Sequence, residues 1–268
     1  MLRSLFLILP VVCLGFAANA QDSRLERLDT GDDSRMWQAV GRLDVGGRGF
    51  CTGALISPKL VLTAAHCLYD KRTGQAIDIE KIEFLAGWRN GRAEAYRWVK
   101  RAVTHPEYEF HNQVAADRVR NDVALLELHH PIRNTRVVPF KTDIRPRKGQ
   151  RIGVVSYAAD RAEAPSLQEV CDVMGRQDGV LVMSCDVNFG SSGAPIFTFD
   201  SGEPRVVSVV SAMAEVEGRK VSLGTQLQRP LDLLYAQLDN NRVVTPKKGT
   251  SRFTSGENRQ TGAKFAKP

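Results

Sequence analysis

The chain has 268 residues, of which 43% are hydrophobic and 25% are charged, a composition typical of a globular protein with one large or two small domains. The net charge is +7, but it is concentrated near the C-terminus. Residues 242–268 contain seven basic side chains and one acidic side chain, and Arg3 adds one positive charge, so residues 21–241 are neutral overall. The basic excess therefore does not describe a nucleic-acid-binding face, and we expect no nucleic acid partner.

The first twenty residues have the pattern of a secretory signal peptide. Arg3 supplies a positive start, residues 5–15 form a short apolar run, and Ala18–Ala20 fits a cleavage site flanked by small residues. The apolar run is shorter than the ~18 residues that a membrane-spanning helix needs. We therefore expect a secreted or periplasmic protein.

Removal of residues 1–20 would leave four cysteines, Cys51, Cys67, Cys171 and Cys185. An even number of cysteines in an exported protein favours two disulfide bonds. A structural zinc site would need close pairs such as Cys-x-x-Cys, which the sequence lacks. We therefore expect neither a metal nor a cofactor.

Residues 21–35 are polar, and we expect an exposed leader with candidate cleavage points at Arg24, Arg27 and Arg35. After the leader, short segments rich in β-branched and aromatic residues alternate with turns, which predicts strands. The predicted strands are residues 37–43, 50–56, 60–64, 82–87, 96–104, 123–128, 151–157, 180–184, 194–199, 205–213 and 220–225. Many short strands without intervening helices indicate an all-β sandwich or barrel.

One helix is predicted over residues 230–238, where Pro230 can open the first turn. Apolar side chains recur there at helical spacing, at Leu231, Leu234, Tyr235 and Leu238. We expect this stripe to pack on the last barrel. Residues 242–268 are basic and poor in apolar side chains, which predicts a disordered tail, either solvated or in weak contact with an anionic cell-envelope surface.

The segment Gly190-Ser191-Ser192-Gly193 is the first candidate for chemistry. Glycine on both sides of Ser192 allows a sharp turn with exposed N–H groups. A hydroxyl beside such donors suits a nucleophile that faces a developing oxyanion. Clusters of Gly, Ser and Pro are also common in ordinary turns, so other segments must decide between the two interpretations.

His66 and Asp122 each occupy a distinctive position. His66 follows an apolar strand and precedes Cys67, and a bridge from Cys51 to Cys67 would fix the backbone beside this candidate general base. Asp122 precedes an apolar strand, where a carboxylate needs a partner such as an imidazole N–H. The alternatives are a structural histidine and an aspartate that caps a strand.

In these blocks the sequence resembles the chymotrypsin-like serine peptidases, and among them the bacterial branch related to the glutamyl endopeptidases. The matching blocks are residues 51–67, His105-Pro106 with Tyr108, residues 121–126, Cys185-Asp186 and residues 190–195. The resemblance implies two six-stranded antiparallel β-barrels and a C-terminal α-helix. The peptidase domain would comprise residues 36–241, with barrels of roughly residues 36–140 and 141–241.

The resemblance also implies an exported serine endopeptidase that acts through an acyl-enzyme. Ser192 would attack the peptide carbonyl, His66 would accept and return the proton, and Asp122 would orient His66. The backbone N–H groups of Gly190 and Ser192 would form the oxyanion hole. The alternative is a catalytically silent homologue that acts as a binding protein. We expect a monomer whose partners are protein or peptide substrates.

Further implications concern activation and specificity. Ser191 stands where many digestive relatives carry an Asp that pairs with a new N-terminus, so we expect that activation switch to be absent. The resemblance also pairs Cys171 with Cys185. The candidates for the pocket that receives the side chain before the scissile bond are Asp186, Ser211 and Met213. An Asp186 carboxylate in this pocket would favour Arg or Lys, and otherwise this residue would hydrogen-bond its own loop.

Overall fold

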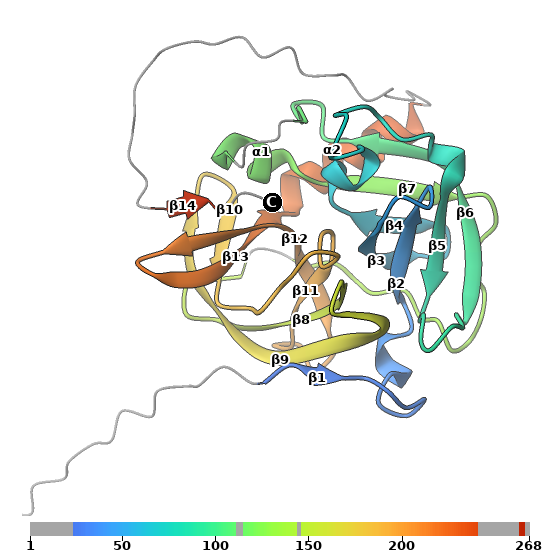
Figure 1. The fold of residues 1–268 in the computed structure, drawn as a ribbon, viewed down its shortest axis with the longest axis horizontal. Coiled ribbons are helices and arrows are strands. Elements are labelled where there is room, and N and C mark those ends of the chain that lie inside the picture. The colour runs from blue at the N-terminus through green and yellow to red at the C-terminus, as the bar shows by residue number, and fades with distance from the viewer. Residues whose placement is uncertain (1–23, 111–114, 144–145, 241–262, 266–268) are drawn as a thin grey trace, which may run out of the picture.

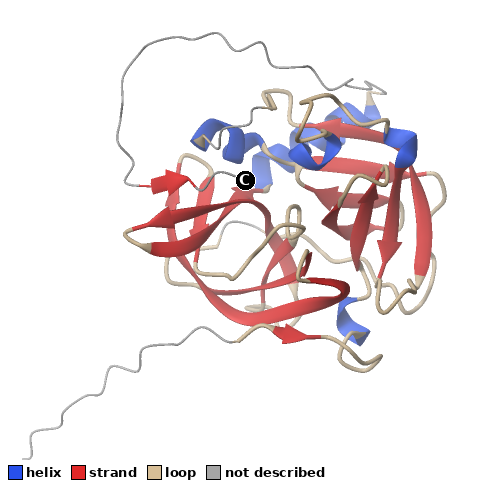
Figure 2. Cartoon of the chain, viewed as in Figure 1, coloured by secondary structure: helices blue, strands red, loops and turns tan. Residues whose placement is uncertain are grey.

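The computed structural model describes residues 24–110, 115–143, 146–240 and 263–265, which form two β-barrels side by side (Figure 1, Figure 2). The predicted signal peptide, residues 1–20, lies outside these ranges. Within the ranges, no helix combines the length and hydropathy needed to span a membrane. The predicted all-β class with a C-terminal helix is confirmed.

The first barrel is a closed sheet of six antiparallel strands. In spatial order they are β2 (Val40–Val45), β3 (Phe50–Ser57), β4 (Leu60–Thr63), β7 (Ala124–Leu128), β6 (Ala95–Thr104) and β5 (Ile82–Ala86). Closure leaves no free sheet edge, and apolar side chains such as Phe84, Leu125 and Leu126 fill the interior. Strand β7 is buried along its whole length, which explains its nearly uniform apolar sequence.

The second barrel also closes, because β8 pairs with both β9 and β11. Its strands in spatial order are β8 (Arg151–Ala158), β9 (Arg161–Gln177), β10 (Val180–Met183), β13 (Arg219–Gln226), β12 (Arg205–Val216) and β11 (Pro195–Thr198). Two short strands extend this sheet, β1 (Glu26–Arg27) on β9 and β14 (Ala263–Phe265) on β12. The seventeen-residue β9 is the one long strand that the sequence pattern did not predict.

Both terminal segments differ in part from the sequence expectation. The leader is largely exposed, but β1 pairs with β9, Leu28 is buried, and Arg89 donates hydrogen bonds to Thr30 and Ser34. The predicted disordered tail contains the strand β14 at residues 263–265, and its other residues lie outside the described ranges.

The predicted helix is present as α2 (Gln228–Asp239), and Leu231, Leu234 and Leu238 are buried as the stripe requires. The expectation that it packs on the last barrel is wrong, because α2 contacts β6 of the first barrel. An apolar stripe specifies burial but does not specify which surface receives it. A short helix α1 (Ala116–Asn121) and 3₁₀ turns at Arg35–Trp37, Ala65–Leu68 and Ile79–Lys81 were not predicted.

An aromatic cluster joins the two barrels. Trp37 precedes β2, Phe140 lies in the connection between the barrels, and Phe197 lies on β11. The ring centroids of Trp37 and Phe197 are 5.0 Å apart, and those of Phe140 and Phe197 are 4.8 Å apart. Such tilted and edge-on pairs of buried rings stabilise the junction beyond their buried area.

Candidate active site

His66 and Asp122 form a buried pair in the first barrel. Their segments come together because β4 pairs with β7, with Thr63 opposite Ala124. His66 Nδ1 lies 2.6 Å from Asp122 Oδ2, and the His66 backbone N–H donates to Oδ1 at 2.8 Å. The two residues are 2% and 0% exposed. The carboxylate therefore fixes both the backbone and the ring of His66.

A third group, the Ser211 hydroxyl on β12, donates a hydrogen bond to Asp122 Oδ2. Complete burial by itself raises the Asp122 pKa, but His66, Arg118 and the Ser211 hydroxyl outweigh burial and hold the pKa below its ordinary value. Ser211 was predicted to line the substrate pocket, and its local sequence did not indicate this contact with Asp122. Asp122 thus remains an anion in a fully buried position.

Ser192 lies in the turn before β11. Its side chain is partly buried. Among the described residues the Ser192 hydroxyl has no hydrogen-bond partner, so it does not hydrogen-bond to His66 in this structure. The N–H groups of Gly190 and Ser192 also lack an acceptor in the described part of the chain, whereas those of Ser191 and Gly193 bond to nearby carbonyls. Gly190 has φ +97°, and a Cβ there would lie 2.4 Å from the Phe50 ring.

Thr52 on β3 connects this turn to the first barrel. Its N–H donates to the carbonyl of Ser192 at 2.9 Å, and its Oγ1 donates to the carbonyl of Gly190 at 2.9 Å. The neighbouring Cys51 forms a disulfide with Cys67, which follows His66. The turn with Ser192 and the segment with His66 therefore meet where the barrels join. The cysteine block was recognisable in the sequence, but no role was predicted for Thr52.

Close packing of Gly193 supports the same arrangement. A Cβ on Gly193 would lie 2.1 Å from Thr63 Oγ1 and 2.8 Å from the backbone nitrogen of Ala64. Ala64 is two residues before His66. The absence of a side chain at position 193 is what allows the second barrel to approach the histidine segment this closely.

Ser191 supports the turn from within. It is fully buried, and its Oγ lies 3.2 Å from Ser156 Oγ and 3.3 Å from the carbonyl oxygen of Tyr157. It also accepts a hydrogen bond from the Asn188 N–H. These contacts are all between neutral groups.

The other two predicted pocket residues are Asp186, in the loop after β10, and Met213, on β12. Asp186 is exposed, has no ion-pair partner among the described residues, and donates its N–H to Gln168 Oε1 at 2.7 Å. Met213 is half-buried and packs against the core of the second barrel. A disulfide joins Cys171 on β9 to Cys185, directly before Asp186.

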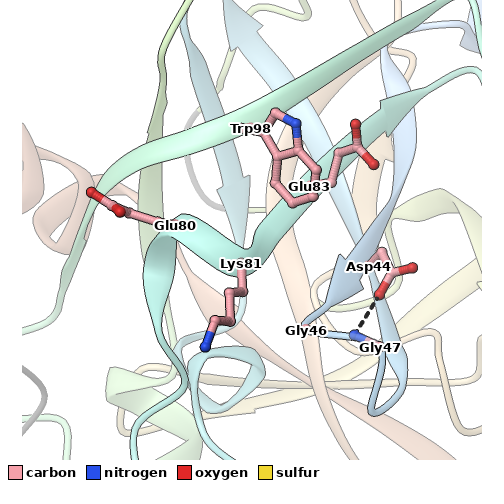
Figure 3. Close-up of a pocket in the computed structure, with 7 residues that line it drawn as sticks. All are labelled: Asp44, Gly46, Gly47, Glu80, Lys81, Glu83 and Trp98. Carbon is pink, nitrogen blue, oxygen red and sulfur yellow. Dashed lines mark hydrogen bonds between the residues drawn. The ribbon is translucent and has the colours of Figure 1, made fainter.

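Two further features of the described residues are a cysteine–histidine cluster and a surface cavity. Cys51, His66 and Cys67 cluster closely, but both sulfurs are in the disulfide, so neither is available as a thiolate ligand. A cavity of about 370 Å³ on the outer face of the first barrel contains none of the predicted catalytic residues (Figure 3). It is lined by Asp44, Gly46, Gly47, Glu80, Lys81, Glu83 and Trp98.

Comparisons with known sequences identify several relatives. A trypsin from Phaedon cochleariae is 32% identical over 179 residues, which cover 59% of this chain and 64% of that protein. Glutamyl endopeptidase from Bacillus licheniformis is 25% identical over 171 residues, with coverages of 63% and 52%. Serine protease 23 from Mus musculus is 29% identical over 163 residues, with coverages of 55% and 42%. The chain thus spans between 42% and 64% of the length of these relatives.

The solved structure of a Glu endopeptidase in complex with MPD has a TM-score of 0.63 and 17% identity, and the match covers 83% of this chain and 97% of that chain. At this identity the similarity shows the fold alone. The family described as Trypsin matches residues 29–231, which include both barrels and the segments of His66, Asp122 and Ser192. The chain therefore belongs to the trypsin family.

Proposed function

We propose that the protein is an exported serine endopeptidase in which His66, Asp122 and Ser192 act together. The observation that carries this proposal is the buried His66–Asp122 pair with its 2.6 Å contact. With Nδ1 held by the carboxylate, Nε2 is the nitrogen left to act as a base. Membership of the trypsin family supports the same reaction class.

In the proposed reaction, Ser192 Oγ attacks the carbonyl carbon of a peptide bond while His66 accepts the hydroxyl proton. The N–H groups of Gly190 and Ser192, which have no acceptor among the described residues, stabilise the oxyanion, a contribution of about 100-fold or more in rate for each donor. His66 then donates the proton to the leaving amine, which leaves an acyl-enzyme. Water hydrolyses this ester by the same route, and Asp122 stabilises the imidazolium each time it forms.

Export is supported by the two disulfides, because such bonds persist in oxidising compartments. The signal pattern of residues 1–20 agrees with this location. A secreted or periplasmic protein would meet substrates outside the cytosol, and we propose that these are proteins or peptides.

Covalent labelling by a fluorophosphonate, together with hydrolysis of denatured protein, tests the proposal. Ser192→Ala should abolish both signals, and Asp122→Asn should slow them by about 10⁴-fold, because the imidazole would take the wrong tautomer. Ser201→Ala, at an exposed turn of the same barrel, is the matched control and should react like wild type. Absence of labelling in folded, leader-trimmed protein would instead support the silent binding homologue.

We propose Asp186 as the candidate determinant for a basic side chain before the scissile bond. Its carboxylate is exposed and has no cationic partner among the described residues. A cleavage profile on denatured proteins should then show a bias for Arg and Lys that Asp186→Ser removes. A profile with an unrelated preference would contradict this assignment without affecting the assignment of Ser192.

A further inference from the structure

Lys71 and Phe189 meet across the junction of the two barrels, beside the proposed catalytic residues. Lys71 lies in the loop that follows the His66 turn, and Phe189 directly precedes Gly190. The Lys71 ammonium nitrogen is 5.6 Å from the centroid of the Phe189 ring, which is a cation–π distance. Phe189 is 45% exposed, so this pair stands at the surface of the site.

Both partners have fixed backbones. The Asp70 carboxylate accepts hydrogen bonds from the N–H groups of Arg72 and Thr73, which closes a tight turn around Lys71. The carbonyl of Phe189 accepts a hydrogen bond from Ala159 at 2.7 Å. The cation is therefore presented by an ordered loop, which reduces the entropy lost when it binds a partner.

Lys71 has no carboxylate partner in the described part of the chain. Asp70, its neighbour in the chain, pairs with Arg48 at 2.7 Å, and Asp122, whose charge acts on Lys71, pairs with His66. Lys71 is exposed, but desolvation by its neighbours and the nearby charge of Arg118 lower its pKa and outweigh the opposing charge of Asp122. Within the described residues, this ammonium at the edge of the site therefore forms no ion pair.

The position of the leaving amine indicates on which side of the scissile bond Lys71 would contact a substrate. In the proposed reaction the leaving amine lies beside His66, because this imidazole returns the proton to it. Lys71 belongs to the segment that continues from His66, and Phe189 adjoins the proposed oxyanion donor Gly190. The first residues after the scissile bond would therefore pass next to the Lys71–Phe189 pair.

We propose that Lys71, held against Phe189, is a specificity-determining residue that favours a substrate with Asp or Glu at the first or second position after the scissile bond. This inference rests on the proposed function. The substrate carboxylate would form an ion pair with the ammonium while the adjacent chain crosses the exposed ring. No covalent step involves Lys71.

The test uses one peptide sequence identified as a cleavage site in a digest of denatured protein. Versions of this peptide differ only in Glu, Gln or Lys at the two positions after the scissile bond. For wild type, kcat/KM should be about three- to fivefold higher with Glu than with Gln, the range of a solvent-accessible ion pair, and high salt should reduce the ratio. The difference should lie mainly in KM, because the contact exists before the chemical step.

Lys71→Gln should bring the Glu-to-Gln ratio close to one, and Lys71→Arg should retain it. Lys81→Gln is the matched control, since Lys81 is an exposed lysine beside the cavity of Figure 3, away from the site. A ratio that Lys71→Gln leaves unchanged, or wild-type cleavage that ignores the charge, would overturn the inference while Ser192 still reacts with the fluorophosphonate. If wild type neither cleaves the peptide nor reacts with the fluorophosphonate, the proposed function fails, and this inference fails with it.

Discussion

Gly193→Ala tests whether the two barrels approach each other as closely as the structure indicates. Gly193 has φ +76°, a conformation that side chains with a Cβ rarely adopt. Its added methyl group would also overlap Thr63 Oγ1 at 2.1 Å, the carbonyl oxygen of Thr52 at 2.4 Å and the nitrogen of Ala64 at 2.8 Å. Two of these three atoms are backbone, so rotation of a side chain cannot relieve the overlap.

Gly218→Ala separates the cost of the left-handed backbone conformation from the cost of the atomic overlap. Gly218 lies in the turn between β12 and β13 with φ +75°, and an added Cβ would meet no atom within 4 Å. The left-handed conformation alone should therefore cost Gly218→Ala about 1–2 kcal/mol. Gly193→Ala carries the same cost plus about 1–3 kcal/mol for overpacking, so we expect a total of about 2–5 kcal/mol.

Urea unfolding of both variants measures these free energies, and fluorophosphonate labelling measures the effect on Ser192. Gly193→Ala should be the less stable variant and should label more slowly, because relief of the overlap moves the adjacent serine turn away from the His66 segment. Gly218→Ala should label at the wild-type rate. Equal stability and equal labelling of the two variants would refute the close contact between the turn and β4.

Three further predictions concern other parts of the fold. Ser211→Ala removes a hydrogen bond to the buried Asp122 carboxylate, so it should raise the Asp122 pKa and lower stability by about 1.5–3 kcal/mol in thermal or urea unfolding. Glu127 has a pKa below its ordinary value, because its pairing with lysine and arginine outweighs the opposing effect of burial. Its stabilisation is therefore present above the unfolded-state pKa and lost as pH falls through the lower folded-state pKa. Glu127→Gln should lower stability at neutral pH by about 1–3 kcal/mol, and unfolding curves of the two proteins should converge below about pH 4. Burial of the Leu28 side chain contributes about 1.5–3 kcal/mol, so a chain truncated after Leu28 should melt at a lower temperature than one cleaved after Arg24.

The strand pattern of the sequence predicted most of both barrels, since mostly apolar segments such as residues 60–64 and 123–128 coincide with strands. Strand β9 escaped prediction because Pro165 and the charged residues Glu163 and Glu169 interrupt its alternation. The strand tolerates them because it is long, bulged and exposed along part of its length. A local pattern cannot report a strand whose regularity depends on three neighbouring strands.

The residues of the candidate site were also predicted only in part from the sequence. His66, Asp122 and Ser192 were visible because each lies in a distinctive local block. Thr52 was not, because its contribution is a hydrogen bond to Gly190, 138 residues away in the chain. Ser211 likewise reaches Asp122 across 89 residues. Polar residues that act through contacts between the barrels carry no local signal, so only the folded structure assigns them.

The hydrogen bonds of Ser191 hold the turn that contains Ser192 without a charged partner. An Asp at this fully buried position would need a cation close by, because an unpaired charge in the interior is strongly destabilising. The serine hydroxyl instead bonds to Ser156 on β8, and Ser156 lies opposite Ser166 of β9. Ser166 in turn lies opposite Arg27 of β1, so the N-terminal segment meets the outer edge of the same row of strands. The turn therefore contains no buried carboxylate for a new N-terminal amine to neutralise, which is the physical reason to expect that activation does not use that ion pair.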